Sequence, residues 1–270
     1  MIEHYVDGPS QERWDARPRR WVGERLRRLL KPRQTEASTT FVRRGGGWLS
    51  RNLTDPLRPP PLKQARMIER QARATQAMGP QRLWDGYRDV EDYPRPTVGE
   101  RTSEEVRSEP LMGRIFAWIA ATRRPDAIVE IGTAFGVSGM YWLAGLELAA
   151  RGRLYTFEAN EGWGQIARGN LEAVSSRFQL TVGPFEDNVR AVLGDRRMDI
   201  GFIDAIHTSA FVFAQYEILK RYAAPGALIL FDDITFSDDM KACWRWLAAL
   251  PEVQASAEID DRVGVIELVG

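Results

Sequence analysis

The chain has 270 residues, of which 44% are hydrophobic and 27% charged, a composition that is typical of a globular protein and excludes a disordered one. Its single cysteine, Cys243, excludes an intrachain disulfide framework and a cysteine-based zinc cluster. The first residues lack the charged-then-apolar pattern of a signal peptide, and the longest apolar runs, such as 115–121, are too short to span a bilayer. We therefore expect a soluble, cytoplasmic protein without a membrane span.

The formal net charge of zero hides an uneven distribution. Residues 1–100 contain 20 Lys and Arg against 13 Asp and Glu, whereas residues 101–270 contain 17 against 24. A basic segment can meet nucleic acid, an anionic surface or an acidic partner. It can also neutralise the acidic part of its own chain, and we favour this second interpretation because charge runs are usually solvated faces.

Residues 1–101 are interrupted by proline and glycine, as in 45–47 and 59–61. Apolar residues from Trp21 to Leu30 recur at helical spacing among arginines, which predicts an amphipathic basic helix that lies on a membrane surface or packs on its own protein. A second helix is predicted over 61–78. We expect a helical or irregular extension here, followed by a separate domain over 102–270.

From residue 102 the pattern becomes regular. Helices and strands are predicted to alternate, with helices over 103–122, 137–150, 163–174, 186–193, 211–222 and 240–250, and strands over 127–131, 154–157, 178–182, 199–203, 227–231, 253–259 and 263–269. This order predicts an α/β fold: a Rossmann-like, seven-stranded, mostly parallel sheet with helices on both faces. Ligands of such sheets bind beyond the carboxyl ends of the strands.

Glycines and acids stand at those strand ends. Gly132 and Gly136 follow the first strand in the spacing Gly-x-x-x-Gly, which is neither the dinucleotide-binding Gly-x-Gly-x-x-Gly nor a triphosphate-binding loop. Glu158 ends the second strand, where an acid can accept hydrogen bonds from both hydroxyls of a ribose. The loop 183–186 could enclose a base. Further acids end the fourth and fifth strands, namely Asp204, Asp232 and Asp233.

These motifs resemble, in order and spacing, those of the class I S-adenosylmethionine-dependent methyltransferases. The resemblance rests on Glu-x-Gly-x-x-x-Gly-x-Ser at 130–138, the acid after the second strand, and Pro-Gly-Ala before the fifth. Phe-Ile-Asp-Ala-x-His at 202–207, followed by Pro-Gly and then Asp-Asp at 232–233, is similar to the small-molecule O-methyltransferases of the catechol and macrolide-sugar types. The resemblance covers about residues 102–270, and in residues 1–100 we recognise no family motif.

The resemblance implies a role for each matching residue. It places S-adenosylmethionine against a cofactor-binding set of Glu130, Gly132, Thr133, Gly136, Ser138, Glu158, Phe185 and Asp204. It assigns a divalent metal, Mg²⁺, to Asp204, Asp232 and Asp233. The catechol type more often has Asp-Asn at the last pair, so the Asp-Asp pair fits the sugar type better.

The chemistry of methyl transfer supports these roles. A hydroxyl is a poor nucleophile until it is deprotonated, and Mg²⁺, which prefers oxygen ligands, can lower the pKa of a hydroxyl. His207, three residues after Asp204, is a candidate general base, and these two residues form the candidate catalytic pair.

Structural roles are the alternatives. Asp204 can be a helix cap, His207 a loop residue and Phe185 part of the core. Asp232 and Asp233 point to opposite faces unless the chain turns there.

The sequence therefore predicts an O-methyltransferase that acts on a small hydroxylated metabolite such as a sugar, a natural product or a catechol. The alternatives are an RNA or protein methyltransferase that uses the basic extension, and a scaffold without activity. The extension lacks a recognisable nucleic-acid module, which argues against RNA, and the intact acid set argues against a scaffold. We expect the extension to be a lid over the acceptor or a contact in a homo-oligomer.

Overall fold

A computed structural model describes residues 34–86 and 99–270 of the chain, and residues 35–270 form one compact unit. The basic amphipathic helix predicted from Trp21 lies outside the described residues. No helix in the described ranges is long and apolar enough to cross a membrane.

The first elements of the unit precede the predicted domain. They are β1 (Thr39–Arg43), α2 (Trp48–Asn52), α3 (Ala65–Ala77), β2 (Gln81–Arg82) and β3 (Glu100–Arg101). The remaining elements alternate as α4 (Ser103–Val106), α5 (Pro110–Arg123), β4 (Ala127–Ile131), α6 (Val137–Ala149), β5 (Arg153–Glu158), α7 (Glu161–Glu172), β6 (Phe178–Val182), α8 (Phe185–Leu193), β7 (Met198–Ile203), α9 (Ser209–Leu219), a 3-10 turn (Lys220–Tyr222), β8 (Ala223–Phe231), α10 (Asp238–Ala248), β9 (Val253–Ile259) and β10 (Val263–Leu268).

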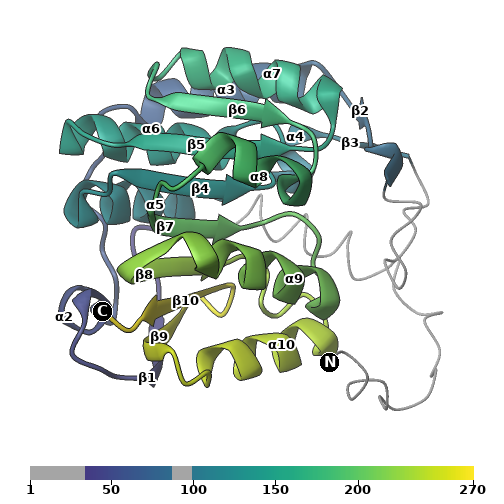
Figure 1. Cartoon of the computed structure of the whole chain (residues 1–270). Coiled ribbons are helices and arrows are strands. Elements are labelled where there is room, and N and C mark those ends of the chain that lie inside the picture. The colour runs from purple at the N-terminus through teal and green to yellow at the C-terminus, as the bar shows by residue number, and fades with distance from the viewer. Residues whose placement is uncertain (1–33, 87–98) are drawn as a thin grey trace. The chain divides into compact units, whose positions relative to one another are not determined.

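One eight-stranded sheet organises the unit, in the order β1-β9-β10-β8-β7-β4-β5-β6 (Figure 1). The strands β8, β7, β4, β5 and β6 pair in parallel, whereas β10 pairs antiparallel with both β8 and β9. The predicted α/β fold with a mostly parallel sheet is confirmed. Because the five parallel strands share one direction, their carboxyl ends meet at one edge.

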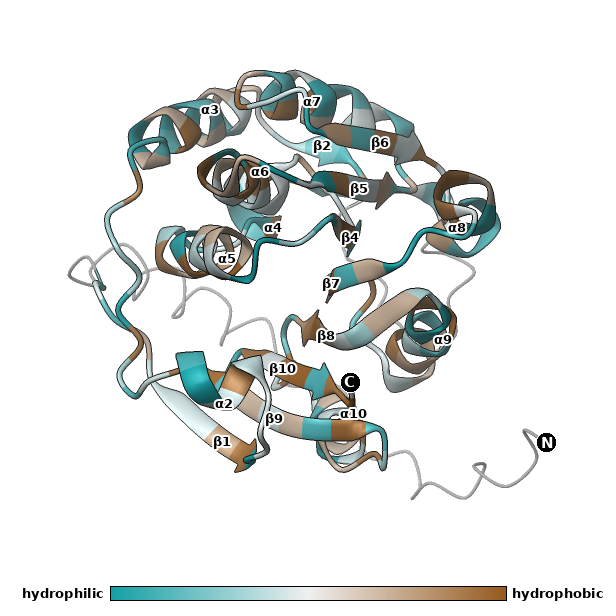
Figure 2. Cartoon of the chain, turned by 60° about the vertical axis from the view of Figure 1, so that its left-hand side comes forward, coloured by the Kyte–Doolittle hydropathy of each residue, from teal (hydrophilic) through white to brown (hydrophobic). Residues whose placement is uncertain are grey.

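Helices cover both faces of the sheet (Figure 2). Side chains alternate along β4, so that Ile128 packs in the core with α5 and α6 while Val129 packs in the core with α8, α9 and α10. Each face is closed by aromatic residues, with Phe116 stacked on Trp142 at 4.7 Å between ring centroids on the first face and Tyr216 beside Phe231 at 6.2 Å on the second. The sheet is thus buried on both sides, which fixes the loops at its edge.

Two of the differences from the predicted elements concern the helix over 103–122 and the main sheet. The single helix predicted over 103–122 is divided into α4 and α5 because Pro110 disfavours helical backbone at the residue before it, and Glu109 is extended with ψ 152°. The sheet has one strand more than predicted, since β1 pairs antiparallel with β9 along its outer side.

Residues before 102 are attached to the rest of the unit by buried polar groups. The carboxylate of Glu267, on β10, accepts hydrogen bonds from the backbone N–H groups of Trp48 and Leu49 at the start of α2, at 2.6 and 2.7 Å. Glu69 on α3 pairs with the buried Arg107 and accepts the hydroxyl of Tyr141 on α6. The described part of the extension is therefore built into the same unit as the sheet.

Candidate active site

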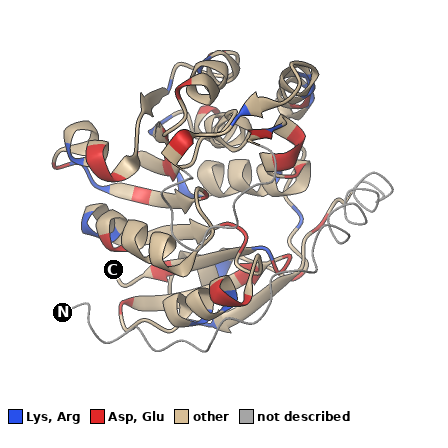
Figure 3. Ribbon diagram, turned by 90° about the vertical axis from the view of Figure 1, so that its right-hand side faces the viewer, with Lys and Arg blue, Asp and Glu red and all other residues tan. Residues whose placement is uncertain are grey.

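Backbone hydrogen bonds join the strand ends at the carboxyl edge. The N–H of Asp204 donates to the carbonyl of Ile131 at 2.9 Å, and the N–H of Asp232 donates to that of Ile203 at 3.0 Å. These bonds continue the parallel pairings past the strands, so the polar residues that follow β4, β7 and β8 are held at fixed spacing. Figure 3 looks onto this edge, where acidic segments lie among the strand ends.

The glycine loop after β4 requires both of its glycines. Gly132 has φ +93°, and a Cβ built on it would lie 2.1 Å from the carbonyl oxygen of Asp204. Gly136, with φ +81°, is the residue from which α6 begins. No other residue type fits at 132 without moving the end of β7. The loop is therefore packed as closely as possible against the neighbouring strand end and opens at the amino end of a helix.

Glu158 ends β5 beside this loop. Its carboxylate accepts the N–H of Ala134 at 2.7 Å and the N–H of Asn160 at 2.8 Å, and 7% of the residue is exposed. Burial raises the pKa of Glu158 to about 7, against the lowering effect of the two backbone hydrogen bonds. The carboxylate is thereby oriented next to the glycine loop, where the sequence analysis expects the ribose.

Glu130 lies within β4, behind the glycine loop. It is fully buried, and its oxygens accept the hydroxyls of Ser138 at 2.7 Å and Thr156 at 2.6 Å. The hydroxyl of Thr133 bonds in turn to that of Thr156. Burial raises the pKa of Glu130 to about 7. Glu130 thus bonds directly to Ser138 and is linked through Thr156 to Thr133, which joins three members of the predicted cofactor set behind the loop.

Phe185, another member of the predicted set, is buried at the start of α8. Its ring packs edge-on against Phe157 at 5.2 Å between centroids, and 2% of the residue is exposed. This is the core position that the sequence analysis gave as the alternative.

The remaining predicted residues come together at the ends of β7 and β8. Asp233 has φ +52°, so the chain turns there and both acids of the pair can face the same space. The Nε2 atom of His207 lies 3.8 Å from an oxygen of Asp204 and 3.6 Å from an oxygen of Asp233. Burial and the neighbouring charge of Asp232 raise the pKa of Asp204 well above its ordinary value.

Arg262, which the sequence analysis did not single out, enters this acidic group from the β9–β10 turn. Its Nε and Nη2 atoms donate to the two oxygens of Asp232 at 2.9 and 2.7 Å, and Nε lies 3.3 Å from Asp233. Burial works to raise the pKa of Asp232, but the charge and hydrogen bonds of Arg262 outweigh it and hold that pKa below its ordinary value. The nearby carboxylate of Asp232 in turn raises the pKa of Arg262.

This arrangement does not fit the predicted metal site. Both oxygens of Asp232 are directed at a guanidinium, which leaves that carboxylate poorly placed to ligate Mg²⁺. Among residues 34–86 and 99–270, no group of three or more His, Cys, Asp or Glu has the geometry to hold a metal ion.

Two more residues of this edge carried no strong sequence signal. Phe236 packs on His207 with 5.4 Å between ring centroids and is 48% exposed, so it offers an aromatic surface beside the candidate base. Asn160 accepts the N–H of Trp163 at the start of α7 and donates to the carbonyl of Arg82, which ties β2 to the edge near Glu158.

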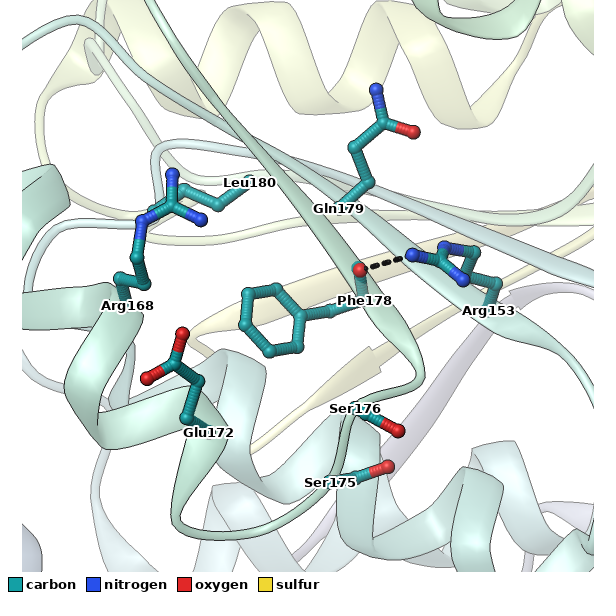
Figure 4. Close-up of a pocket in the computed structure, with 8 residues that line it drawn as sticks. All are labelled: Arg153, Arg168, Glu172, Ser175, Ser176, Phe178, Gln179 and Leu180. Carbon is teal, nitrogen blue, oxygen red and sulfur yellow. Dashed lines mark hydrogen bonds between the residues drawn. The ribbon is translucent and has the colours of Figure 1, made fainter.

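A surface depression of about 390 Å³ lies elsewhere, between α7 and β6 (Figure 4). Arg153 begins β5 and donates to the carbonyl of Phe178, which begins β6, at 2.6 Å. This depression is therefore at the amino ends of the strands, opposite to the glycine loop, and is not the candidate active site.

Comparisons with known proteins agree with this reading of the fold. Residues 129–234 match a methyltransferase domain family. An O-methyltransferase of Aspergillus thermomutatus, ankF, is 24% identical over 147 residues, which cover 53% of this chain and 59% of that protein. The match thus spans less than two thirds of the length of that relative.

Solved structures share the fold at low identity. The O-methyltransferase TomG of Streptomyces achromogenes, solved with S-adenosylmethionine, has a TM-score of 0.54 and 20% identity over 75% of this chain and 89% of its own. An O-methyltransferase of Bacillus cereus, solved with the demethylated cofactor, has a TM-score of 0.52 and 23% identity over 76% of this chain and 100% of its own. The chain thus has a methyltransferase-like segment over residues 129–234 and shares the fold of these O-methyltransferases, with the glycine loop at 132–136 and the acid that ends β5 at the carboxyl edge of the sheet.

Proposed function

We propose that the protein transfers a methyl group from S-adenosylmethionine to a hydroxyl of a small molecule. The observation that carries this proposal is the glycine loop bonded to Glu158, with Ala134 donating to that carboxylate across neighbouring strand ends. The pair offers a closely packed turn at a helix N-terminus and, beside it, an acid that has no basic partner within 34–86 and 99–270. This combination suits a ligand that bears both a carboxylate and a ribose.

The residues of this half of the edge fit the cofactor. Gly132 and Gly136 would let the cofactor come close to the backbone of the loop. Glu158 would accept hydrogen bonds from the ribose hydroxyls. Glu130, Thr133 and Ser138 would hold the loop from behind through their mutual hydrogen bonds. When bound, the sulfonium of S-adenosylmethionine supplies an electrophilic methyl group.

The other half of the edge would prepare the acceptor. We assign the role of general base to His207, because a proton taken up on Nε2 would lie between the carboxylates of Asp204 and Asp233. Two acids at 3.6–3.8 Å would stabilise the imidazolium formed in that step. Asp204 would act beside His207 as an orienting group.

No step is assigned to the Mg²⁺ expected from the sequence, because Arg262 engages both carboxylate oxygens of Asp232. The exposed ring of Phe236 beside His207 favours an acceptor with a flat or apolar part next to its hydroxyl, as many natural products have. The extension would add to the pocket wall, since Arg82 on β2 bonds to Asn160 near Glu158.

The experiment is a pair of measurements on the full-length protein. Calorimetry with S-adenosylmethionine and with its demethylated product tests the cofactor, and transfer of a tritiated methyl group to catechol, phenol and sugar acceptors tests the reaction. We expect the protein to bind the cofactor and to place the labelled methyl group on an acceptor hydroxyl, which gives a methyl ether. Binding of neither cofactor form, or transfer only to RNA or protein, would contradict the proposal.

A further inference from the structure

Arg262 is the one described cation bonded to the acids at the ends of β7 and β8. Its Nε and Nη2 atoms meet both oxygens of Asp232 in a fork, and Asp232 is only 3% exposed. Such a two-bond pairing is the strongest arrangement between a guanidinium and a carboxylate. Arg262 is therefore part of the candidate site, because it is paired with a buried carboxylate of that site.

The backbone around Arg262 is held on both sides. Its N–H donates to the carbonyl of Ile259 within the turn, and its carbonyl accepts the N–H of Ile234, which follows the two acids of β8. The preceding turn residue, Asp260, accepts the N–H and the hydroxyl of Ser38. The guanidinium is thus presented to Asp232 by a turn that is itself anchored, and it needs no large movement to act as a fixed charge.

A guanidinium and a divalent cation compete for the same place. Both require the carboxylate oxygens of Asp232, and both carry positive charge, so occupancy by one repels the other. Arg262 has the advantage of being covalently attached to the site. Two of the three acids that the resemblance assigns to a metal, Asp232 and Asp233, are in this chain already paired with a cationic residue of the protein.

We infer that Arg262 supplies the positive charge of this site in place of a divalent cation, so that methyl transfer by this protein needs no metal. The inference rests on the proposed function for the reaction, but its statement about metal binding stands without it. Arg262 is a positioning residue in this account: it fixes Asp232 and offsets the charge of Asp233 so that His207 and Asp204 can handle the proton.

The first test is binding of Mn²⁺ to the full-length wild-type protein, freed of metal with a chelator and followed by electron paramagnetic resonance. We expect that no Mn²⁺ ion binds at Asp232. The wild-type protein and Asp232→Asn should therefore give the same Mn²⁺ titration. One equivalent bound by wild type and lost in Asp232→Asn would overturn the inference. Calorimetry with S-adenosylmethionine on the same sample separates this outcome from a failure of the proposed function.

Substitutions of Arg262 give the second test. Arg262→Gln removes the charge and exposes three acids, so it should gain Mn²⁺ binding that a further Asp232→Asn removes. Arg262→Lys keeps the charge and should not gain it, and Arg245→Gln on α10 serves as a control for loss of an arginine elsewhere. If Arg262→Gln does not fold, the wild-type titration decides alone.

Turnover provides an independent reading once an acceptor is known. Rates of the wild-type protein in excess chelator should equal those with added Mg²⁺. Loss of turnover in chelator, with recovery on adding Mg²⁺, would contradict the role assigned to Arg262.

Discussion

Two pairs of strands at one edge carry carboxylates with opposite surroundings. Among the described residues, Glu130 and Glu158, on β4 and β5, hydrogen-bond to neutral partners alone, namely hydroxyls and backbone N–H groups, and burial raises the pKa of each to about 7. Asp232, at the end of β8, faces a permanent cation, and its pKa lies below the ordinary value. The neighbours of each carboxylate thus decide whether its pKa is raised or lowered.

The difference indicates how the work is divided along the edge. A carboxylate with neutral partners can accept hydrogen bonds from an uncharged, hydroxyl-rich ligand without displacing a salt bridge. A carboxylate paired with arginine is a fixed element that keeps charge in balance while protons move nearby. We therefore expect changes on the β4–β5 side to act on cofactor affinity, and changes on the β7–β8 side to act on folding and turnover.

The largest effect should come from breaking the buried pair on the β7–β8 side. Arg262→Met leaves Asp232 charged without a partner, which costs about 3–5 kcal/mol of the free energy of unfolding. Urea unfolding measures this loss. The double variant Asp232→Asn with Arg262→Met should recover much of it, and equal stability of the single and double variants would mean that the pair is not coupled.

On the β4–β5 side, Glu158→Ala should weaken binding of S-adenosylmethionine while the fold persists. Hydrogen bonds to a charged group contribute roughly 1.5–3 kcal/mol each, so loss of even one reduces affinity at least about tenfold. Calorimetry gives the affinity, and Glu161→Ala, at the exposed start of α7, is the matched control. Unchanged affinity of Glu158→Ala would remove this residue from the site.

The raised pKa of Glu158 makes cofactor affinity depend on pH. The ionised carboxylate is the better acceptor for the ribose, so binding should strengthen as pH rises and level off above about 7. Between pH 6 and 8 the gain is about tenfold for a single proton released on binding. Calorimetry in two buffers of different ionisation enthalpy counts that proton. Glu158→Gln should abolish the dependence, whereas a slope that persists in this variant would point to another group.

The same pKa shifts bear on stability with the opposite sign. Folded Glu130 and Glu158 hold their protons up to about pH 7, whereas the unfolded groups lose them near their ordinary value of 4.5. Their contribution to the free energy of unfolding is therefore complete below about pH 4.5 and is lost as pH rises through 7. Chemical unfolding of Glu130→Gln should show a flatter pH profile than wild type over this range, and a parallel profile would argue against the shift at Glu130.

The smallest effect is expected where β2, in the extension, contacts the start of α7 through Asn160. Asn160→Ala removes the cap of α7 and the bond to Arg82, at a cost of about 1 kcal/mol in the free energy of unfolding. Thermal unfolding, with Asn188→Ala on α8 as the control, measures it. A loss as large as that of Arg262→Met would mean that β2 supports the whole edge.

The order of elements from β4 to β10 could be predicted because each is encoded locally, by an apolar run or a helical spacing. The positions of Asp204, Asp232 and Glu158 followed from the rule that polar residues after parallel strands share an edge. The pairing of Arg262 with Asp232 could not be predicted, because it depends on how a hairpin turn folds back on a strand 30 residues earlier. The one sequence signal was a basic residue directly after the turn at Asp260 and Asp261.

The strand β1 was missed for a related reason. Its sequence, Thr-Thr-Phe-Val-Arg, is a short strand-like run, but its partner β9 lies more than 200 residues away, and flanking glycines and prolines suggested irregular structure. The domain boundary at 101/102, the oligomeric state and the location of the protein stay predictions, as do the individual site roles. Nothing in the local pattern specifies which hydroxyl enters beside His207.

The place of β10 between β8 and β9 has a consequence for synthesis of the chain on the ribosome. β8 stands at an open edge until β10 has emerged, and β1, made among the first elements, waits for β9 before it can pair. Such long-range pairing slows folding, and an open edge strand is a template for aggregation. A nascent chain stalled or cut before residue 253 lacks both β9 and β10 and would therefore leave β8 and β1 without these partners, and we expect such fragments to depend on chaperones.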